Sequence, residues 1–342
     1  GSEKSQILPI ACPRVLYSSS AAAKSSSFLQ HIATIAPSSS KRLAIKEPSP
    51  LCPAEMRAFF PVNWRSISLL LHINRNMAYD GPMSGLPELT ETSFAGKVSI
   101  VTGGASGIGA VVADRLSKLG SSVVVVDTDE KGGESIADSV GGDFIKFDVA
   151  DLAGWEKLVA DTARQYGSLD FLCLNAGIGS RPRGSSVEDD PIPWILPNYK
   201  NVLAVNVDGV VYGAMAALPF MEKQGSGSIL VTASVAGIRT QAPDPIYALS
   251  KSAVISFVRS VAPALAERGV QINALCPGSV DTPIQPDDRR LAGRPMSPPE
   301  EMAEAIGRIL VSDDNGGIWI ASSSDYPVWR YEFASAIDGP PS

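Results

Sequence analysis

Strand-like and helix-like segments alternate in this chain from residue 97 almost to its end. The run SSVVVVD at 121–127 is apolar without interruption, which is typical of a strand buried on both faces of a parallel sheet. The segment before it, GAVVADRLSKLG, has the pattern of an amphipathic helix that stops at Gly120. The expected strands are 97–102, 121–127, 143–148, 169–177, 227–234, 270–278 and 316–321, and the expected helices are 109–120, 152–167, 198–223, 245–269 and 298–314.

Strands that alternate with helices form right-handed βαβ units and one doubly wound sheet. The sequence therefore predicts an α/β fold of the Rossmann type: a seven-stranded, mainly parallel sheet with helices on both faces, in a single domain at 91–342. Ligands of such sheets bind at the carboxyl ends of the strands, so the residues after each strand are the candidate site. The domain ends in an aromatic tail, where Trp329, Tyr331 and Phe333 either pack on a neighbouring subunit or form a plain surface tail.

Residues 1–90 differ in composition and are expected to form a leader outside the fold. Segment 1–79 carries nine Lys and Arg residues against three acids, with serine clusters and no sustained apolar period. Disordered chains and transit peptides share this composition. The leader is a non-folding extension ahead of a start at Met77, an organelle transit peptide within 1–76, or a functional arm. We expect a cytoplasmic protein, or an organelle protein if residues 1–76 are a transit peptide.

Charge and reactive side chains exclude several function classes. The net charge is −7, whereas nucleic-acid binding favours a basic face, so no nucleic acid is expected. The longest apolar run of the leader, SISLLLHI, is far below the roughly 18 residues of a spanning helix, so no membrane span is expected. The only two histidines, His31 and His72, precede the domain, and the cysteines lack metal-type spacing. No metal is therefore expected, and Cys173 and Cys276 are expected to pack as small apolar residues.

The first expected strand leads into the glycine-rich turn TGGASGIG at 102–109. A glycine turn between a strand and a helix offers backbone N–H groups and the positive end of the helix dipole to a pyrophosphate. The spacing is GxxxGxG, and a purely structural turn is the alternative. The candidate dinucleotide contacts in this turn are Gly103, Ser106, Gly107, Ile108 and Gly109.

Asp127 ends the second expected strand, 24 residues after Gly103. A carboxylate at this place accepts both hydroxyls of an adenosine ribose and repels a 2′-phosphate. Neither Thr128 nor the glycine turn supplies an Arg or Lys for that phosphate, so NAD rather than NADP is predicted. A helix cap or turn role is the alternative for Asp127. The third and fourth strand ends add the candidate contacts Asp148, Val149, Asn175, Ala176 and Gly177.

With YALSKSAV at 247–254 and PGSVDT at 277–282, these motifs come in the order of the short-chain dehydrogenase/reductase family. The chain resembles that family over about 94–322, although Leu174 stands where the family usually has the first Asn of NNAG. The resemblance implies a catalytic tetrad of Asn206, Ser234, Tyr247 and Lys251. Besides Tyr247 and Lys251, it implies further cofactor contacts at Pro277, Gly278, Val280 and Thr282.

Hydride transfer gives the four side chains distinct roles. Oxidation of a secondary alcohol releases a proton, and a free tyrosine titrates near pH 10, too high for a base at neutral pH. The ammonium of Lys251 one turn away and the cationic nicotinamide favour the phenolate, so we expect the pKa of Tyr247 to fall. Ser234 would donate to the developing oxyanion, and Asn206 would hold a water that links Lys251 to solvent.

The expected function is that of an NAD-dependent oxidoreductase that interconverts a secondary alcohol and a ketone, with Tyr247 as acid and base. An NADPH-dependent ketoreductase and a non-catalytic nucleotide-binding regulatory protein of the same fold are the alternatives. The partner is a small-molecule alcohol or ketone, and 178–198 and 284–298 are expected to line its pocket. Family habit suggests a homodimer or homotetramer built on helices 199–223 and 246–267.

Overall fold

The computed structural model describes residues 83, 85–182, 185–186, 188–285, 296–322 and 326–333. Of the expected leader, 1–90, only residue 83 and residues 85–90 belong to the described part. Leu86 is buried, and Leu89 lies so close to Gly307 that a Cβ there would come within 2.7 Å of its Cδ1. Packing therefore extends a few residues before the expected domain start at 91.

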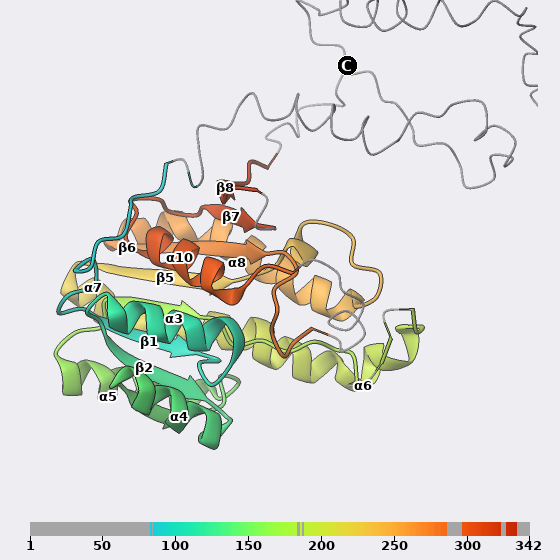
Figure 1. The fold of residues 1–342 in the computed structure, drawn as a ribbon, viewed down its shortest axis with the longest axis horizontal. Helices are drawn as coiled ribbons and strands as arrows, with labels where there is room; N and C mark the ends of the chain where they lie inside the picture. Colours follow the sequence, from blue (N-terminus) through green and yellow to red (C-terminus); the bar gives the residue numbers. More distant parts are fainter. Residues whose placement is uncertain are drawn as a thin grey trace, which may run out of the picture. The chain divides into compact units, whose positions relative to one another are not determined.

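One sheet in the order β3-β2-β1-β4-β5-β6-β7-β8 forms the centre of the domain (Figure 1). The first seven strands are parallel, which confirms the predicted doubly wound sheet. The order reverses between β1 and β4, and this switch point marks the ligand crevice of such folds. The parallel strands are β1 (Val98–Thr102), β2 (Ser122–Asp127), β3 (Asp143–Lys146), β4 (Phe171–Leu174), β5 (Gly227–Thr232), β6 (Val270–Pro277) and β7 (Ile318–Ala321).

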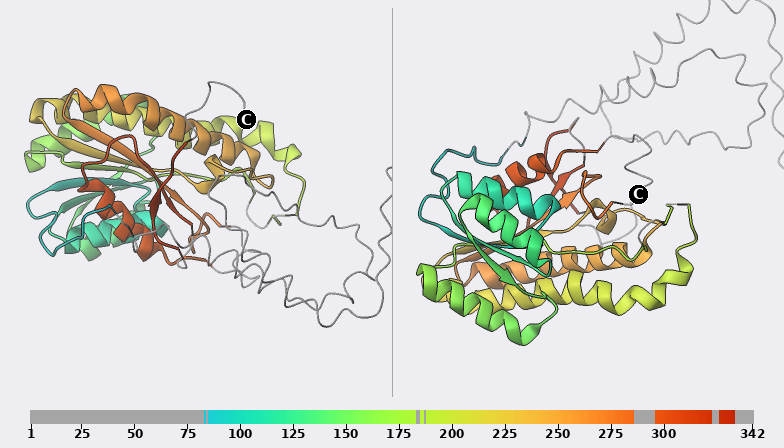
Figure 2. Two further views of the ribbon diagram at one scale, coloured as in Figure 1. Left: turned by 90° about the horizontal axis from the view of Figure 1, so that it is seen from above. Right: turned by 60° about the horizontal axis from the view of Figure 1, so that its bottom comes forward.

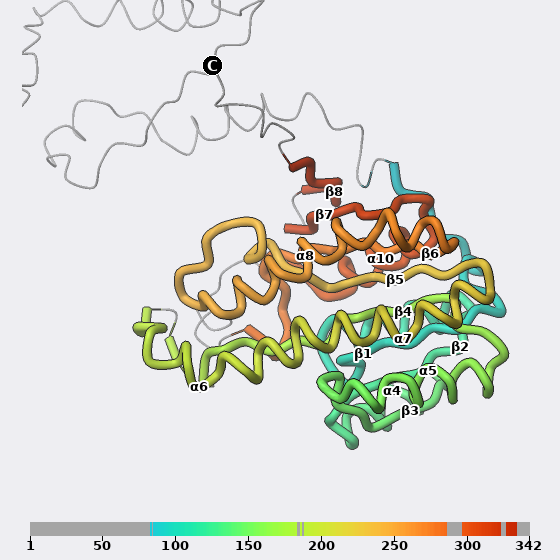
Figure 3. The backbone as a smooth tube through the Cα atoms, turned by 180° about the vertical axis from the view of Figure 1, so that it is seen from behind, coloured from blue at the N-terminus to red at the C-terminus, as the bar shows by residue number. Residues whose placement is uncertain are grey.

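Helices cover both faces of the sheet, as Figures 2 and 3 show. One face carries α3 (Gly107–Lys118), α4 (Glu130–Val140) and α10 (Pro299–Leu310), and the other carries α5 (Leu152–Tyr166), α7 (Gly209–Gln224) and α8 (Pro245–Ala266). Because helices pack on both sides, consecutive residues of the central strands are buried, as in the middle of β2.

Helix α4 was not expected from the sequence. Its segment EKGGESIADSV contains two adjacent glycines, which lower the helix propensity. The packing requires one of them, because a Cβ at Gly133 would lie 2.0 Å from the ring of Phe144 in β3. Asp129 caps the helix by accepting a hydrogen bond from the Gly132 N–H.

The helix expected at 198–223 begins six residues earlier and has three parts: α6 (Ile192–Leu203), a π-helical turn η4 (Ala204–Asp208) and α7. In Figure 1, α6 projects beyond the sheet. By length and composition alone, the continuous helix Ile192–Gln224 could cross a membrane. Its α7 part belongs to the core, where Ala214, Ala217 and Met221 are fully buried, so a core helix is the simpler reading.

The aromatic tail adds an eighth strand, β8 (Trp329–Arg330), which pairs antiparallel with β7. Trp329, Tyr331 and Phe333 are partly buried and pack against the protein's own core, so they do not form a plain surface tail. The guanidinium carbon of Arg259 in α8 lies 3.7 Å from the centroid of the Phe333 ring. This cation–π contact and the strand pairing hold the tail at the sheet edge.

Candidate active site

The glycine turn after β1 is packed so tightly that side chains are excluded. Gly103 has a φ of +65°, and a Cβ there would come within 2.8 Å of the Ala176 Cα. A Cβ at Gly109 would come within 2.1 Å of the Gly103 carbonyl oxygen. Gly107 has a φ of +54° and faces Thr282, which a Cβ would approach to 3.3 Å. The ends of β1 and β4 and the loop after β6 therefore meet at this turn.

Helix α3 begins at the turn with an N-terminus open to an anion. Ser106 is the N-cap, but its side chain makes no capping hydrogen bond, and the first turn contains no acidic residue. The first N–H groups of a helix lack intrahelical partners and suit a pyrophosphate. Among the candidate contacts here, Ile108 is partly buried, and its side chain packs against the core. The turn fits the predicted dinucleotide.

Asp127 lies at the end of β2 beside this turn. One carboxylate oxygen accepts from the Ala105 N–H at 3.0 Å, and the other accepts from the Asp129 N–H at 3.0 Å. Asp127 therefore has the structural role in a turn that was the alternative to ribose binding. Each carboxylate oxygen has a second lone pair, so both can still accept ribose hydroxyls.

The candidate cofactor contacts after β3 and β4 differ in their exposure to solvent. Asp148 is exposed and accepts from the Ala150 N–H at 3.0 Å, whereas Val149 is buried. The Asn175 amide links three strands, because it donates to the Thr102 carbonyl at 3.1 Å and accepts from the Thr232 hydroxyl at 3.0 Å. Asn175 therefore builds the crevice floor.

The structure brings Ser234, Tyr247 and Lys251 together. The Ser234 hydroxyl lies near enough to the Tyr247 phenol to lower the pKa of Tyr247. Lys251 Nζ lies 5.6 Å from the centroid of the Tyr247 ring and donates to the Thr232 carbonyl at 2.7 Å. Lys251 is only 4% exposed, and its Nζ lies 3.3 Å from where a Cβ of Gly177 would stand. An ammonium has three N–H donors, so Lys251 could also donate to the hydroxyl groups of a cofactor ribose.

Asn206, the fourth member of the predicted tetrad, lies in the π-helical turn and is fully buried. Its amide accepts from the Ile178 N–H at 2.8 Å and donates to the Ile178 carbonyl at 2.9 Å and to the Ser250 hydroxyl at 3.0 Å. The side chain thus joins the chain after β4 to α8. π-Helical turns interrupt the regular ladder and are frequent at functional sites.

Burial acts on the pKa values of both Tyr247 and Lys251. Burial raises the pKa of Tyr247 to about 12 and outweighs the lowering by the Ser234 hydrogen bond, with smaller raising contributions from Asp244 and Cys276. Burial also lowers the pKa of Lys251 to about 8. Both charged forms lose hydration on burial, so the phenol of the protein without cofactor has a raised pKa. The fall that we expect with the cationic nicotinamide bound stays a prediction. Cys276 is inert, since burial raises the pKa of its thiol to about 12.

The sequence reasoning missed Asp244, the N-cap of α8. Its carboxylate accepts from the Tyr247 N–H at 3.1 Å, from the Ser180 N–H at 3.0 Å and from the Ser180 hydroxyl at 2.5 Å. The residue is 8% exposed. An Asp followed by Pro245 before an apolar run is an N-cap signal that could have revealed it. Thr102 and Thr232 were also missed.

The loop after β6 closes the other side of the crevice. At Gly278, which follows Pro277, a Cβ would lie 2.1 Å from the Ser322 carbonyl oxygen. Val280 and Thr282 are buried. Of the expected pocket segment 284–298, residues 286–295 lie outside the described part, as do residues 183, 184 and 187 of 178–198.

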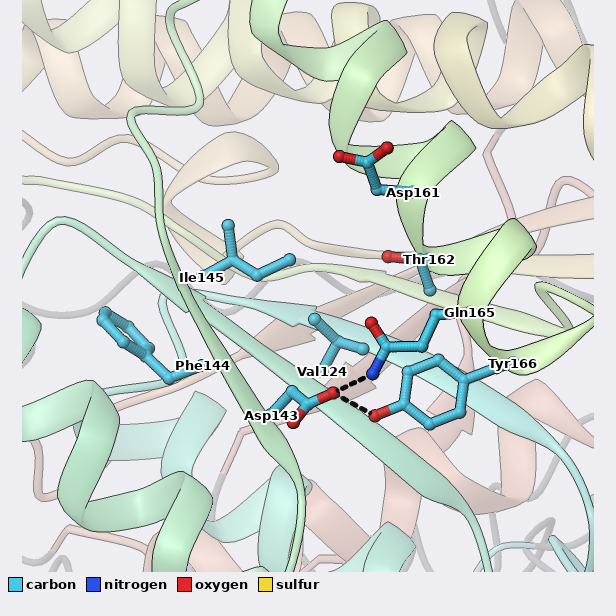
Figure 4. A pocket seen from close by; sticks show the side chains of 8 residues that line it. All are labelled: Val124, Asp143, Phe144, Ile145, Asp161, Thr162, Gln165 and Tyr166. Atoms are coloured by element: carbon cyan, nitrogen blue, oxygen red, sulfur yellow. Dashed lines mark hydrogen bonds between the residues drawn. The ribbon is translucent and has the colours of Figure 1, made fainter.

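Two further observations bear on what the site can hold. The described residues contain no group of three or more His, Cys, Asp or Glu side chains that could hold a metal. A hollow of about 240 Å³ lies between β3 and α5, where Asp143 accepts from the Tyr166 hydroxyl at 2.5 Å (Figure 4). Asp143 opens β3, so this hollow lies away from the carboxyl ends that carry the site.

Comparisons with known proteins agree with this geometry. A family model described as short chain dehydrogenase matches residues 97–291. Cis-4-hydroxycyclohexanecarboxylate dehydrogenase of Sinomonas cyclohexanicum is 35% identical, with 65% of this chain and 91% of the relative covered. NADP-dependent (R)-specific alcohol dehydrogenase of Lentilactobacillus kefiri is 33% identical, with 71% and 96% covered. The structure of levodione reductase superposes with a TM-score of 0.60 at 28% identity, with 68% and 98% covered. The chain therefore belongs to the short-chain dehydrogenase family and is a nicotinamide-dependent oxidoreductase of alcohol- or ketone-like substrates.

Proposed function

We propose that this enzyme uses NAD to interconvert a secondary alcohol and a ketone, with Tyr247 as the acid and base. The observation that carries the proposal is the meeting of Tyr247, Ser234 and buried Lys251 beside the crevice of the glycine turn. A non-catalytic regulatory protein would have no need of a buried ammonium next to a phenol.

The four side chains divide the work of alcohol oxidation. A bound nicotinamide supplies the hydride acceptor and, in its oxidised form, a positive charge. The phenolate of Tyr247 takes the proton of the alcohol hydroxyl, and Ser234 donates to the same oxygen and orients it. Lys251 stabilises the phenolate. Both N–H groups of the Asn206 amide are used, but its oxygen accepts only one hydrogen bond, so Asn206 can still hold the water that would link Lys251 to solvent.

The choice of NAD over NADP rests on Asp127. Its carboxylate stands beside the glycine turn, where it would repel the 2′-phosphate of NADP. The L. kefiri relative is named as NADP-dependent, so an NADPH-dependent ketoreductase is the alternative. Activity with NAD and NADP at equal concentrations separates the two.

An alicyclic secondary alcohol is the substrate class that we propose. The names of the S. cyclohexanicum relative and of 2,5-dichloro-2,5-cyclohexadiene-1,4-diol dehydrogenase of Sphingobium indicum both describe hydroxyl groups on six-membered rings. A screen of cyclic and linear alcohols with NAD, followed by NADH absorbance, tests the function. No turnover of any alcohol or ketone with either cofactor would refute it.

We further propose a homodimer or homotetramer that uses the outer faces of α7 and α8, where Met215 and Leu249 are exposed. A cytoplasmic location, or an organelle if residues 1–76 are a transit peptide, remains a prediction. Fluorescent fusions with and without residues 1–76 test it.

A further inference from the structure

Arg181, in the chain after β4, carries a guanidinium that forms no ion pair within the described part of the chain. Its Nε and Nη2 atoms are buried, and neither has a hydrogen-bond partner among the residues that the structure describes. The guanidinium lies over the ring of Trp194 in α6, whose centroid is 5.6 Å from Arg181 Cζ. A cation–π contact at this distance satisfies none of the N–H groups.

Buried polar groups in folded proteins are nearly always hydrogen-bonded, and the exceptions need an explanation. An apolar side chain would fill the same space without the cost of two unpaired N–H groups. Apart from the contact with Trp194, the guanidinium has no partner among the described residues that accounts for its two unpaired N–H groups. A guanidinium with free N–H donors is a binding group for a planar anion.

The backbone at Arg181 is fixed relative to the Tyr247 helix. The neighbouring Ser180 donates twice to Asp244, and Asp244 accepts from the Tyr247 N–H. The Ser180 carbonyl accepts from the side chain of Asn198 in α6 at 2.8 Å. The loop with Arg181 is thus tied to α6 and to the start of α8, the helix that carries Tyr247.

We propose that Arg181 binds a carboxylate of the substrate, so that the preferred substrates are hydroxy acids, or the matching keto acids, whose carboxylate stands several bonds from the carbinol carbon. This inference rests on the proposed oxidation of alcohols at Tyr247. One guanidinium balances one negative charge and matches the two oxygens of a carboxylate. A phosphate dianion fits less well, because the same loop continues into Glu188, Asp189 and Asp190.

The test compares a cyclohexanol that bears a ring carboxylate with its methyl ester, in the full-length enzyme and in Arg181→Gln. We expect kcat/KM for the acid to fall about 10- to 100-fold in the variant, the range for a lost hydrogen bond to a charged group, while the ester changes little. Lys200→Gln is the matched control, because it removes an exposed cation of α6, and it should leave both values within about twofold. The Tm of Arg181→Gln should fall only slightly, because the cation–π contact with Trp194 is the one interaction lost among the described residues.

Binding of cyclohexanecarboxylate to the enzyme–NADH complex, measured by calorimetry, separates this inference from the proposed function. Weaker binding to Arg181→Gln than to the unmodified enzyme supports the carboxylate site, even if no alcohol is oxidised. Equal binding to both proteins overturns it, even if neutral alcohols are oxidised with NAD. An equal loss of activity toward acid and ester also overturns it, since the role of Arg181 would then be structural.

Discussion

Tyr247 is the residue on which the proposed chemistry depends most. Tyr247→Phe removes the phenol oxygen and keeps the ring beside Lys251. We expect kcat to fall by about 10²- to 10⁴-fold, the usual contribution of a positioned acid or base. The Kd of NADH, measured by fluorescence, should stay the same because the glycine turn is untouched. Turnover close to that of the unmodified enzyme would refute the role of Tyr247.

Lys251 predicts a pH dependence of cofactor binding. Its pKa is about 8 in the free protein, because burial disfavours the ammonium. Ribose hydroxyls that accept from Nζ would favour the ammonium, so NADH binding raises this pKa and takes up a proton above pH 8. Affinity should therefore fall as pH rises beyond about 8, by at most about tenfold per pH unit.

Calorimetry of NADH binding across this pH range, in buffers of different ionisation enthalpy, measures both the Kd and the proton uptake. Lys251→Met should bind more weakly and lose the pH dependence. A Kd that is flat through pH 8 in the unmodified enzyme would show that the cofactor does not contact Nζ.

Asp127 should set the cofactor preference by its charge. Asp127→Asn keeps an oxygen acceptor for one of the two backbone N–H groups and removes the charge that repels a 2′-phosphate. We expect the ratio of kcat/KM for NAD to that for NADP to fall about 10- to 100-fold, in the range of hydrogen bonds to charged groups. Asp148→Asn, at the next strand end, is the control. An unchanged ratio in Asp127→Asn would assign the preference to another group.

The residues that sequence analysis identified and those that it missed differ in a physical way. Tyr247 and Lys251 are one helical turn apart, so their proximity follows from local spacing. The hydrogen bond from Asn175 to Thr102 joins residues 73 positions apart, and no local pattern announces it. The raised pKa of Tyr247 in the protein without cofactor could not be read from the sequence for the same reason, because burial by the whole fold raises it.

At the level of elements, the residue that caps the N-terminus of α8 also acts on the pKa of the proposed catalytic tyrosine. Asp244 caps the helix, and its charge contributes to the raised pKa of Tyr247. Asp244→Asn keeps one acceptor and removes the charge. We expect the rising limb of the oxidation pH profile to move to lower pH, because a smaller charge opposes the phenolate. The free energy of unfolding should fall by at most about 2 kcal/mol, the upper end of the range for loss of an N-cap.

Asp129→Asn is the matched control for this prediction, because Asp129 caps α4 in the same way, with a hydrogen bond from the Gly132 N–H. It should lower the Tm to a similar extent and leave the pH profile unchanged. If Asp244→Asn also leaves the pH profile of oxidation unchanged, the role of Asp244 is limited to capping α8 and to its hydrogen bonds with Ser180.

The helices and strands that the sequence predicted have local patterns, whereas those that it missed depend on contacts distant in the sequence. Long apolar or periodic runs such as SSVVVVD predicted seven strands and most helices, because their patterns are local. Helix α4 was missed because its glycines serve contact with Phe144, and β8 was missed because a two-residue strand carries no period. Tertiary packing overrides propensity in both cases.

At the scale of the whole molecule, the aromatic tail decides whether the sheet edge is closed within the subunit. Tyr331 and Phe333 pack edge to face with centroids 4.9 Å apart, and Arg259 of α8 lies over Phe333. Phe333→Ala should lower the free energy of unfolding by about 1–3 kcal/mol, less than for a fully buried ring. Leu196→Ala, at an 83% exposed position, should change it by less than about 0.5 kcal/mol.

Light scattering after size exclusion should give the same molar mass for Phe333→Ala and the unmodified protein, because the ring packs on its own subunit. A lower mass would instead place Phe333 in the contact between subunits.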